Sequence, residues 1–308
     1  MPSSLIVVVG ATGTGKSALA LALAERLAAE GRRAEIVNAD AMQLYRGMDV
    51  GTAKLGPAEQ RGVPHHLLDI LEPSEESAVA DYQRLARGTI ETLQGRDVVP
   101  ILVGGSGLYV SSVIQDFVFP GRDPAIRARL EAELADIGAH ALHARLAAAD
   151  PRAASQVDPA NGRRVVRALE VVELEGTFTP GLPEDREPWQ LATILALGVE
   201  RERLVPRLDA RVERMWRDGI VEEARALRDG PGLGITASRA IGYAQALARL
   251  DGDITEASAI GATQQLTRRY ARRQVSWFRR YRDATWLDAE SPDLLASAFA
   301  AIRERMEA

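Results

Sequence analysis

Cysteine is absent from this 308-residue sequence, and lysine occurs only at Lys16 and Lys54 although 38 residues are basic. The lack of cysteine excludes disulfide bonds, thiolate nucleophiles and cysteine-based zinc sites. Arginine therefore supplies nearly all of the positive charge. We expect a lysine in such a chain where a compact, flexible point charge has a specific task.

Long hydrophobic runs and an excess of positive charge are missing as well. No stretch approaches the roughly 20 apolar residues that span a bilayer, and the N-terminal run Leu5–Val9 is too short for a signal peptide. We therefore expect a cytoplasmic protein with no membrane partner. The net charge of −5 gives no overall indication of nucleic-acid binding, so such a surface must be local. The four histidines form two pairs without an obvious third ligand, which favours solvated or hydrogen-bonding side chains over a metal site: His65 with His66, and His140 with His143.

A complete phosphate-loop motif follows the first apolar run. Glycines at positions 10 and 15, then Lys16 and Ser17, fill the pattern G-x-x-x-x-G-K-[ST]. The run before the motif predicts a buried strand, and Ser17–Leu27 predicts a helix, which is the context that the motif requires. Loop N–H groups and the positive end of the helix favour a di- or triphosphate, whose charge Lys16 would neutralise while Ser17 ligates Mg²⁺. The predicted phosphate-binding residues are Gly10, Ala11, Thr12, Gly13, Thr14, Gly15, Lys16 and Ser17.

The alternation of strands and helices predicts an α/β fold. Near-continuous Val, Ile and Leu runs separated by helices favour a parallel sheet with helices on both faces. The fourth predicted strand follows a long helical stretch and rejoins the same sheet in this interpretation. The predicted strands are Leu5–Val9, Ala34–Ala39, Val98–Val103 and Leu191–Val199.

Helical periodicity between the third and fourth strands predicts an inserted domain. Segments 125–137, 139–149 and 162–175 have helical spacing, and the Pro-rich stretch Thr177–Pro188 reads as a flexible return connection. We therefore predict a P-loop NTPase-like core over 1–116 and 189–308, including C-terminal helices, and an α-helical insertion domain over 117–188.

Two polar residues follow predicted strands at the edge where doubly wound sheets bind ligands. Asp40 directly follows the second strand, where a carboxylate could hold a metal, act as a general base or cap the next segment. The third strand ends in Gly104-Gly-Ser106 instead of the acidic residue with which P-loop ATPases hold Mg²⁺. Ser106 presents a hydroxyl beside glycines that allow close approach of a ligand, although a tight turn before a helix has the same pattern. The absence of this acidic residue disfavours a motor or switch protein of the P-loop class.

Positive charge gathers in two arginine clusters. One lies in the predicted insertion, and the other lies in residues 267–282, which contain seven arginines and no acidic residue. Like charges at i and i+4 in the second cluster weaken an isolated helix, so an anionic partner explains them. A nucleic-acid backbone fits two separated patches on an acidic protein, and a solvated basic face is the alternative. The clusters are Arg163, Arg164 and Arg167, and Arg268, Arg269, Arg272 and Arg273.

Taken together, these motifs resemble the tRNA dimethylallyltransferase family. Eight ordered segments carry the resemblance and extend over nearly the whole chain, and both lysines fall within them. The segments are Gly10–Ser17, Asp40–Tyr45, Met48–Lys54, Pro64–Asp69, Gly104–Tyr109, Arg164–Glu170, Ile241–Tyr243 and Arg272–Phe278.

The resemblance implies an activity and a division of roles. A dimethylallyl group would pass from dimethylallyl diphosphate to N6 of the adenine adjacent to the tRNA anticodon, with release of diphosphate and with Mg²⁺ as cofactor. Asp40 would accept the amine proton, and Ser106 would position the adenine. Either Arg207 or Arg211 would contact the diphosphate, and we favour Arg211.

The family also implies that the insertion grips the anticodon stem-loop, and we expect the enzyme to act as a monomer. The implied tRNA contacts are Asp40, Ala41, Met42, Gln43, Ser106, Arg127, Arg163, Arg164, Val165, Val166 and Arg167, to which the charge pattern adds Arg268, Arg269, Arg272 and Arg273. A small-molecule kinase that uses the same loop for ATP is the main alternative. An RNA-binding module with a vestigial loop is disfavoured by the intact motif.

Overall fold

The computed structural model describes residues 5–179 and 187–307. Its contacts divide the chain into two compact units. The first comprises Met1–Gln115 and Pro188–Ala308, and the second is Asp116–Glu187. The sequence placed the insertion at 117–188, and part of its Pro-rich return connection, residues 180–186, lies outside the described residues.

The first unit is built on a six-stranded sheet in which every neighbouring pair is parallel. The strand order β3-β2-β4-β1-β5-β6 places β1, which leads into the phosphate loop, between β4 and β5. This arrangement confirms the predicted α/β class. The strands are β1 (Leu5–Gly10), β2 (Ala34–Asn38), β3 (His65–His66), β4 (Val99–Gly104), β5 (Ala192–Gly198) and β6 (Thr285–Asp288).

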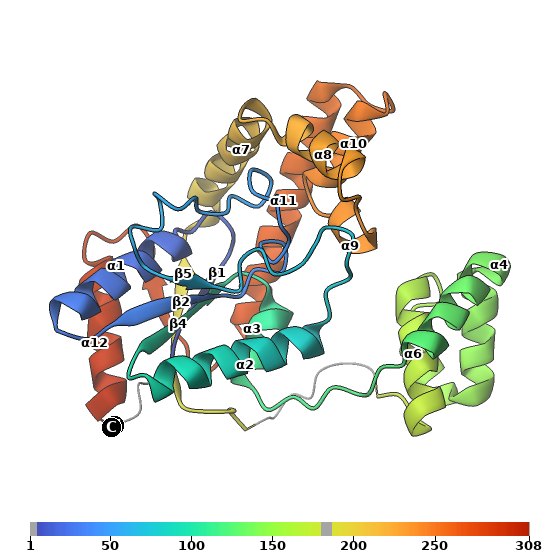
Figure 1. Ribbon diagram of the computed structural model, residues 1–308, viewed down its shortest axis with the longest axis horizontal. Helices are drawn as coiled ribbons and strands as arrows, with labels where there is room; N and C mark the ends of the chain where they lie inside the picture. The colour runs from blue at the N-terminus through green and yellow to red at the C-terminus, as the bar shows by residue number, and fades with distance from the viewer. Residues whose placement is uncertain (1–4, 180–186, 308) are drawn as a thin grey trace. The chain divides into compact units, whose positions relative to one another are not determined.

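Helices cover both faces of this sheet because alternate strand residues point to opposite sides. Ile6 and Val8 join the cluster on the face of α1 (Lys16–Ala29) and α12 (Leu294–Glu307). Val7 and Val9 join the cluster on the opposite face. That face is covered by α2 (Val79–Gly95), α3 (Gly107–Ile114) and the end of α11 (Glu256–Phe278) (Figure 1).

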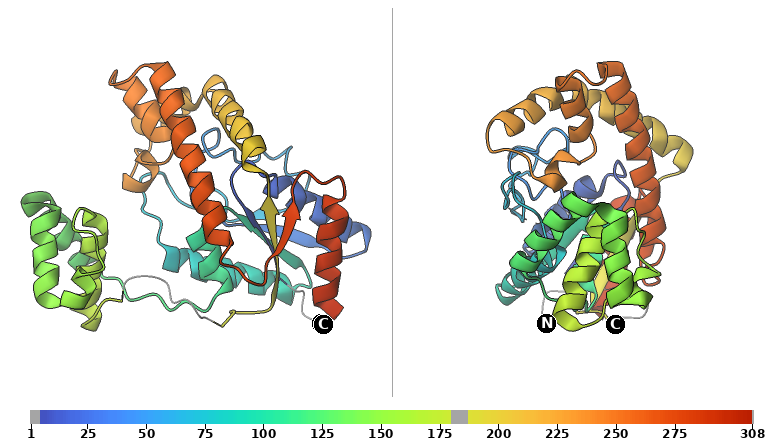
Figure 2. Two further views of the ribbon diagram at one scale, coloured as in Figure 1. Left: turned by 180° about the vertical axis from the view of Figure 1, so that it is seen from behind. Right: turned by 90° about the vertical axis from the view of Figure 1, so that its right-hand side faces the viewer.

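The remaining helices of the first unit pack on the long segment that follows β2. Figure 2 shows α7, α8 and α10 gathered around one end of α11. Tyr45 and Met48, from the segment after β2, are buried against Trp216 and Tyr243 of these helices. The helices are α7 (Arg201–Arg217), α8 (Ile220–Asp229), α9 (Ile235–Ser238) and α10 (Tyr243–Leu250).

The second unit is helical. Its elements are α4 (Pro124–Ala149), α5 (Pro151–Ala154) and α6 (Gly162–Glu175). Asp123 caps α4 by accepting hydrogen bonds from the N–H groups of Ala125 and Ile126. The two helices predicted over 125–149 meet at Gly138, whose φ of 80° breaks the helical path.

Two strands were missed by the sequence analysis, namely β3 and β6, which have two and four residues. Both lie at the edges of the sheet, and neither is long enough to show a hydrophobic period. Among the described residues, no helix has the length and apolar character needed to cross a membrane.

Candidate active site

The phosphate loop joins the central strand β1 to helix α1. Gly10, Gly13 and Gly15 have φ values of 147°, 80° and 88°, which disfavour residues with a Cβ. A Cβ at Gly10 would also lie 2.7 Å from the Leu197 carbonyl oxygen on β5. Thr14 Oγ1 closes the loop by donating to the Ala11 carbonyl at 2.8 Å. The loop therefore leads directly into the N-terminal, positive end of α1, which suits an anion.

Lys16 is held inside this loop. Its Nζ donates to the Ala11 carbonyl at 2.8 Å. Burial lowers the pKa of Lys16 to about 8, an effect that Asp40 opposes and Arg211 reinforces. A bound anion would restore the charge that burial disfavours.

Arg211, rather than Arg207, lies near Lys16 and Asp40. Arg211 Nη2 donates to the Thr52 carbonyl at 3.2 Å, and burial lowers its pKa while Asp40 raises it. Arg207 lies one helical turn away and pairs with Glu290. The structure thus brings Lys16, Asp40 and Arg211 together and leaves Arg207 in a different ion pair.

Asp40 follows β2 and turns the chain at the edge of the sheet. Its Oδ1 accepts a hydrogen bond from Met42 N at 3.0 Å, and its own N–H donates to Asn38 Oδ1 at 3.0 Å. The capping role considered from the sequence is therefore present. It uses one carboxylate oxygen, and the described part of the chain supplies no hydrogen bond to Oδ2.

Ser106 connects this turn to the end of β4. Ser106 Oγ accepts from Ala41 N at 3.1 Å. A Cβ at Gly104 would overlap the Ala39 carbonyl, so glycine is required where β4 passes the end of β2. The two polar residues predicted from strand ends therefore lie on adjacent, hydrogen-bonded turns.

Two residues of α11 that the sequence analysis did not assign to this site also reach it. Gln274 Oε1 accepts from Thr12 N at 2.8 Å, and Gln274 Nε2 donates to the Gly105 carbonyl at 2.8 Å. The hydroxyl of Tyr270 interacts with Ser106 and Gln274, while burial and Asp40 raise the pKa of Tyr270 to about 12. The available signal was the uncharged Gln274 among the arginines of 272–278.

Three further predicted tRNA contacts follow Asp40 in the chain. Ala41, Met42 and Gln43 are half-buried in the same turn, and Gln43 Nε2 donates to the Thr52 carbonyl at 3.3 Å. The same carbonyl oxygen also accepts the hydrogen bond from Arg211 Nη2. The turn that carries the predicted adenine contacts is thus linked to the predicted diphosphate arginine.

Lys54 has a different task from Lys16. Its side chain is 5% exposed and donates to the Tyr45 carbonyl at 2.8 Å and to Asp49 and Asp69 at 2.6 Å each. Glu223 of α8 accepts from the N–H groups of residues 49, 50 and 51. These contacts fix the segment that presents the Thr52 carbonyl to Arg211.

In the insertion, the structure corrects part of the predicted tRNA surface. Val165 and Val166 are 0% and 1% exposed and fill the core of the unit, so their side chains cannot form an RNA-facing surface. Arg127 and Arg167 both pair with the fully buried Glu170, at 3.3 and 2.8 Å. The positive charges of these two arginines are therefore paired with the carboxylate of Glu170 inside the unit.

The other arginines of the two clusters differ in how much of their charge stays exposed. Arg163 and Arg164 lie on the first turn of α6, where no carboxylate of the described residues pairs with them. On α11, Arg268 pairs with Asp209 at 2.6 Å, and the Arg273 guanidinium lies 5.7 Å from the centre of the Tyr270 ring. Arg269 and Arg272 are exposed.

The residues around the phosphate loop fit a magnesium ion that arrives with a diphosphate. Ser17 is exposed at the start of α1, and the loop before it offers N–H groups to phosphate oxygens. Magnesium commonly keeps several waters and binds through one or two protein groups and substrate phosphates. The described residues contain no cluster of three His, Asp or Glu that could hold a metal by itself. Each histidine instead hydrogen-bonds within the protein, as His66 does with Glu35 at 2.6 Å.

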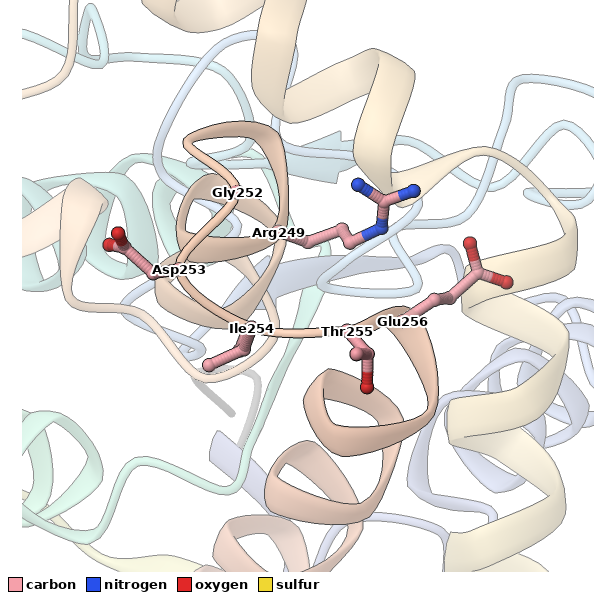
Figure 3. Close-up of a pocket in the computed structure, with 6 residues that line it drawn as sticks. All are labelled: Arg249, Gly252, Asp253, Ile254, Thr255 and Glu256. Atoms are coloured by element: carbon pink, nitrogen blue, oxygen red, sulfur yellow. The ribbon is translucent and has the colours of Figure 1, made fainter.

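A separate depression lies between α10 and α11 (Figure 3). Arg249 of α10 and Glu256 of α11 flank it, and the connecting turn supplies Gly252, Asp253, Ile254 and Thr255. Glu256 stands about 27 Å along α11 from Gln274, at 1.5 Å per residue. None of the predicted site residues lines this depression.

Comparison with known proteins gives one consistent result. Residues 43–281 match the family model described as IPP transferase. The chain is 60% identical over 299 residues to a tRNA dimethylallyltransferase of Clavibacter sepedonicus, covering 97% of each chain. It is 54% identical over 307 residues to a tRNA dimethylallyltransferase of Thermobifida fusca, covering 99% of this chain and 96% of the relative.

Solved structures give the same similarity. The tRNA isopentenylpyrophosphate transferase of Bacillus halodurans is 37% identical, with a TM-score of 0.70 and coverage of 99% of this chain and 98% of that one. A eukaryotic dimethylallyltransferase acting on tRNA is 26% identical, with a TM-score of 0.74 and coverage of 97% and 78%.

Proposed function

This chain belongs to the IPP transferase family, and on that premise we propose that it transfers a dimethylallyl group from dimethylallyl diphosphate to N6 of the adenine next to the anticodon of tRNA. Family membership makes it a transferase that acts on tRNA, in agreement with the resemblance of its motifs. The identity of the donor and the roles of individual residues are part of the proposal.

The observation that carries the proposal is the meeting of two kinds of group at one edge of the sheet. The phosphate loop brings Lys16, and α7 brings Arg211, to the side where Asp40 stands. The end of β4 offers glycines and Ser106, where a P-loop ATPase places an acid to hold Mg²⁺. Cationic groups for a leaving diphosphate thus lie near a carboxylate that can accept a proton.

The reaction needs charge neutralisation and alignment. As adenine N6 attacks C1 of the donor, the new C–N bond forms and the bond from C1 to the diphosphate oxygen breaks. Lys16, Arg211 and the loop N–H groups stabilise the negative charge that grows on the departing diphosphate. Asp40 accepts the proton that N6 loses, using the carboxylate oxygen that does not cap the turn.

A magnesium ion bound with the donor would be held by Ser17 and would add positive charge at the diphosphate. Ser106 lies one hydrogen bond from the Asp40 turn and would orient the adenine. The adenine must leave its stack to enter the site, and exposed arginines would grip the phosphate backbone around it. The structure favours Arg163, Arg164, Arg269 and Arg272 for that role because their side chains are exposed.

The decisive experiment incubates the protein with labelled dimethylallyl diphosphate, Mg²⁺ and unmodified tRNA, and follows label incorporated into the RNA. Recovery of N6-dimethylallyladenosine after digestion of the RNA supports the proposal. Labelled ATP with the same tRNA or with small-molecule acceptors tests the kinase alternative. Transfer of phosphate without transfer of the prenyl group would reject the proposal.

We also propose that the enzyme works on tRNA as a monomer in the cytoplasm. Light scattering of the free protein and of its tRNA complex measures the stoichiometry. A single protein chain per tRNA is expected.

A further inference from the structure

The side chain of Gln274 joins the two loops to which the proposed function assigns different substrates. Its carbonyl oxygen accepts from Thr12 N in the phosphate loop at 2.8 Å. Its amide nitrogen donates to the Gly105 carbonyl, beside Ser106, at 2.8 Å. One rigid amide group therefore spans the distance between the diphosphate loop and the turn that would position adenine.

The turn after β4 is shaped to receive α11. A Cβ on Gly105 would overlap Gln274 Nε2, and a Cβ on Gly107 would lie 2.5 Å from the Trp277 ring. Gln274 and Trp277 are three residues apart and so lie on the same face of the helix. Both glycines thus leave room for α11 side chains, and the helix contacts the turn at two neighbouring points.

The buried amide of Gln274 is hydrogen-bonded at both ends. The residue is 4% exposed, and both ends of its side-chain amide have backbone partners. The Tyr270 hydroxyl interacts with both Gln274 and Ser106, and Ser106 Oγ accepts from Ala41 N next to Asp40. A continuous set of contacts therefore leads from the phosphate loop to the predicted proton acceptor.

We propose that Gln274 is a positioning residue that sets the separation of the diphosphate loop from the Ser106 turn and so aligns adenine N6 with C1 of the donor. The inference rests on the proposed function. It differs from a stabilising role because it predicts a slower chemical step in correctly folded enzyme. Gln274 touches neither substrate in this account and acts through Thr12 and Gly105.

The first test is Gln274→Met, which keeps the length of the side chain and removes both hydrogen bonds. Single-turnover transfer at saturating donor and tRNA is expected to fall by about 10- to 100-fold, the range in which a misplacement of 1 Å acts. The dissociation constants of both substrates are expected to change by less than about fivefold, because none of the groups assigned to direct substrate contact is removed. Rates are expressed per folded molecule, measured by circular dichroism.

The second test is Gln274→Glu, because its protonation restores the lost geometry. A protonated carboxyl can accept from Thr12 N and donate to the Gly105 carbonyl, as the amide does. An ionised carboxylate cannot donate and would oppose that carbonyl. Burial raises the pKa of the introduced carboxyl, so the change falls at an accessible pH.

We therefore expect the single-turnover rate of Gln274→Glu, divided by that of the unaltered enzyme at the same pH, to rise by at least about tenfold between pH 8 and pH 5.5. Division by the parent rate removes the titration of the groups that both enzymes share, among them Lys16 with its pKa of about 8, and Tyr270 stays neutral across this range. Gln274→Met lacks the titrating group, and its ratio should stay constant.

Three outcomes overturn the inference. The first is a Gln274→Met enzyme that reacts within about threefold of the parent, well below the expected range. The second is a Gln274→Glu enzyme whose ratio does not change with pH. The third is a Gln274→Glu protein that fails to fold at every pH, which would assign the residue to stability. The transfer rate of the unaltered enzyme is measured first. If that enzyme transfers no dimethylallyl group, the proposed function is wrong, and the variants are not needed to show it.

Discussion

Replacing Asp40 by Asn tests the proton acceptor directly. Asp40 Oδ1 accepts from Met42 N at 3.0 Å, and an asparagine oxygen can accept the same hydrogen bond. The turn should therefore persist, and the melting temperature should shift by no more than about 3 °C, as expected when no cap is lost. What disappears is the basicity of the carboxylate and its negative charge.

The expected loss is a fall in the single-turnover rate of about 10²- to 10⁴-fold, the usual contribution of a general base. A second effect follows from the charge. Asp40 raises the pKa of Lys16, which is about 8 in the free protein, so the Asn variant should hold Lys16 at a lower pKa. The pH-dependent weakening of donor binding should thus begin at a lower pH in the Asn variant than in the parent.

The assay is rapid-quench transfer from labelled donor at saturating tRNA, with the melting temperature recorded beside it. Asp81→Asn serves as a matched control because Asp81 is an exposed carboxylate of α2 that pairs with Arg84. If the Asp40→Asn enzyme is stable and reacts within about threefold of the parent, below the range for a general base, Asp40 is a cap and another group takes the proton.

Four further outcomes follow from the charges in the structure. Because the pKa of Lys16 is about 8, the affinity for a non-reactive donor analogue should fall by up to about tenfold per pH unit above pH 8. Calorimetry would measure this, and Lys16→Arg should abolish the dependence. Changing Arg269 and Arg272 together to Gln should lower the salt slope of tRNA binding by up to about two, with donor binding unchanged; an unaltered slope would leave them as a solvated face. Arg163→Gln should lower that slope by about one without a change in melting temperature. Arg167→Gln should destabilise the insertion instead, because it removes a partner of the buried Glu170.

Much of the fold could be predicted because its core strands are continuous apolar runs. The predicted ends of β1, β2, β4 and β5 lie within one residue of the observed ends. β3 and β6 do not, since a two-residue strand of histidines and a short edge strand have no hydrophobic period. Their place in the sheet depends on contacts with distant segments, which a local pattern does not contain.

Arg207 and Arg211 of α7 are a case in which the local sequence pattern cannot predict which residue lies at the site. Arg207 and Arg211 are four residues apart and lie on the same face of the helix, so periodicity does not distinguish them. Glu290, which follows β6, pairs with Arg207 and leaves Arg211 beside Asp40. Only the tertiary structure brings that carboxylate to the helix.

The insertion presents the opposite case, in which a local signal was present. Glu170 follows Arg167 by three residues on α6, the spacing of neighbours on a helix face. The predicted tRNA surface counted the arginines alone, although the acidic residue among them is buried and pairs with Arg127 and Arg167. A cluster of arginines indicates a nucleic-acid surface only when those that pair with a buried carboxylate are left out of the count.

Gly104, the last residue of β4, and Gly105 after it explain why a complete phosphate loop need not belong to an ATPase. An acidic side chain at position 105 would meet the Gln274 amide, and one at position 104 would meet the Ala39 carbonyl. The space in which a P-loop ATPase holds its magnesium-binding acid is thus occupied by backbone and by α11. Lys16 of the phosphate loop is present as in an ATPase, and Ser106 and Asp40 lie on the opposite side of the site. That combination suits a reaction in which the diphosphate leaves and a neutral amine attacks, because the attacking side needs a proton acceptor rather than a second anchor for the metal.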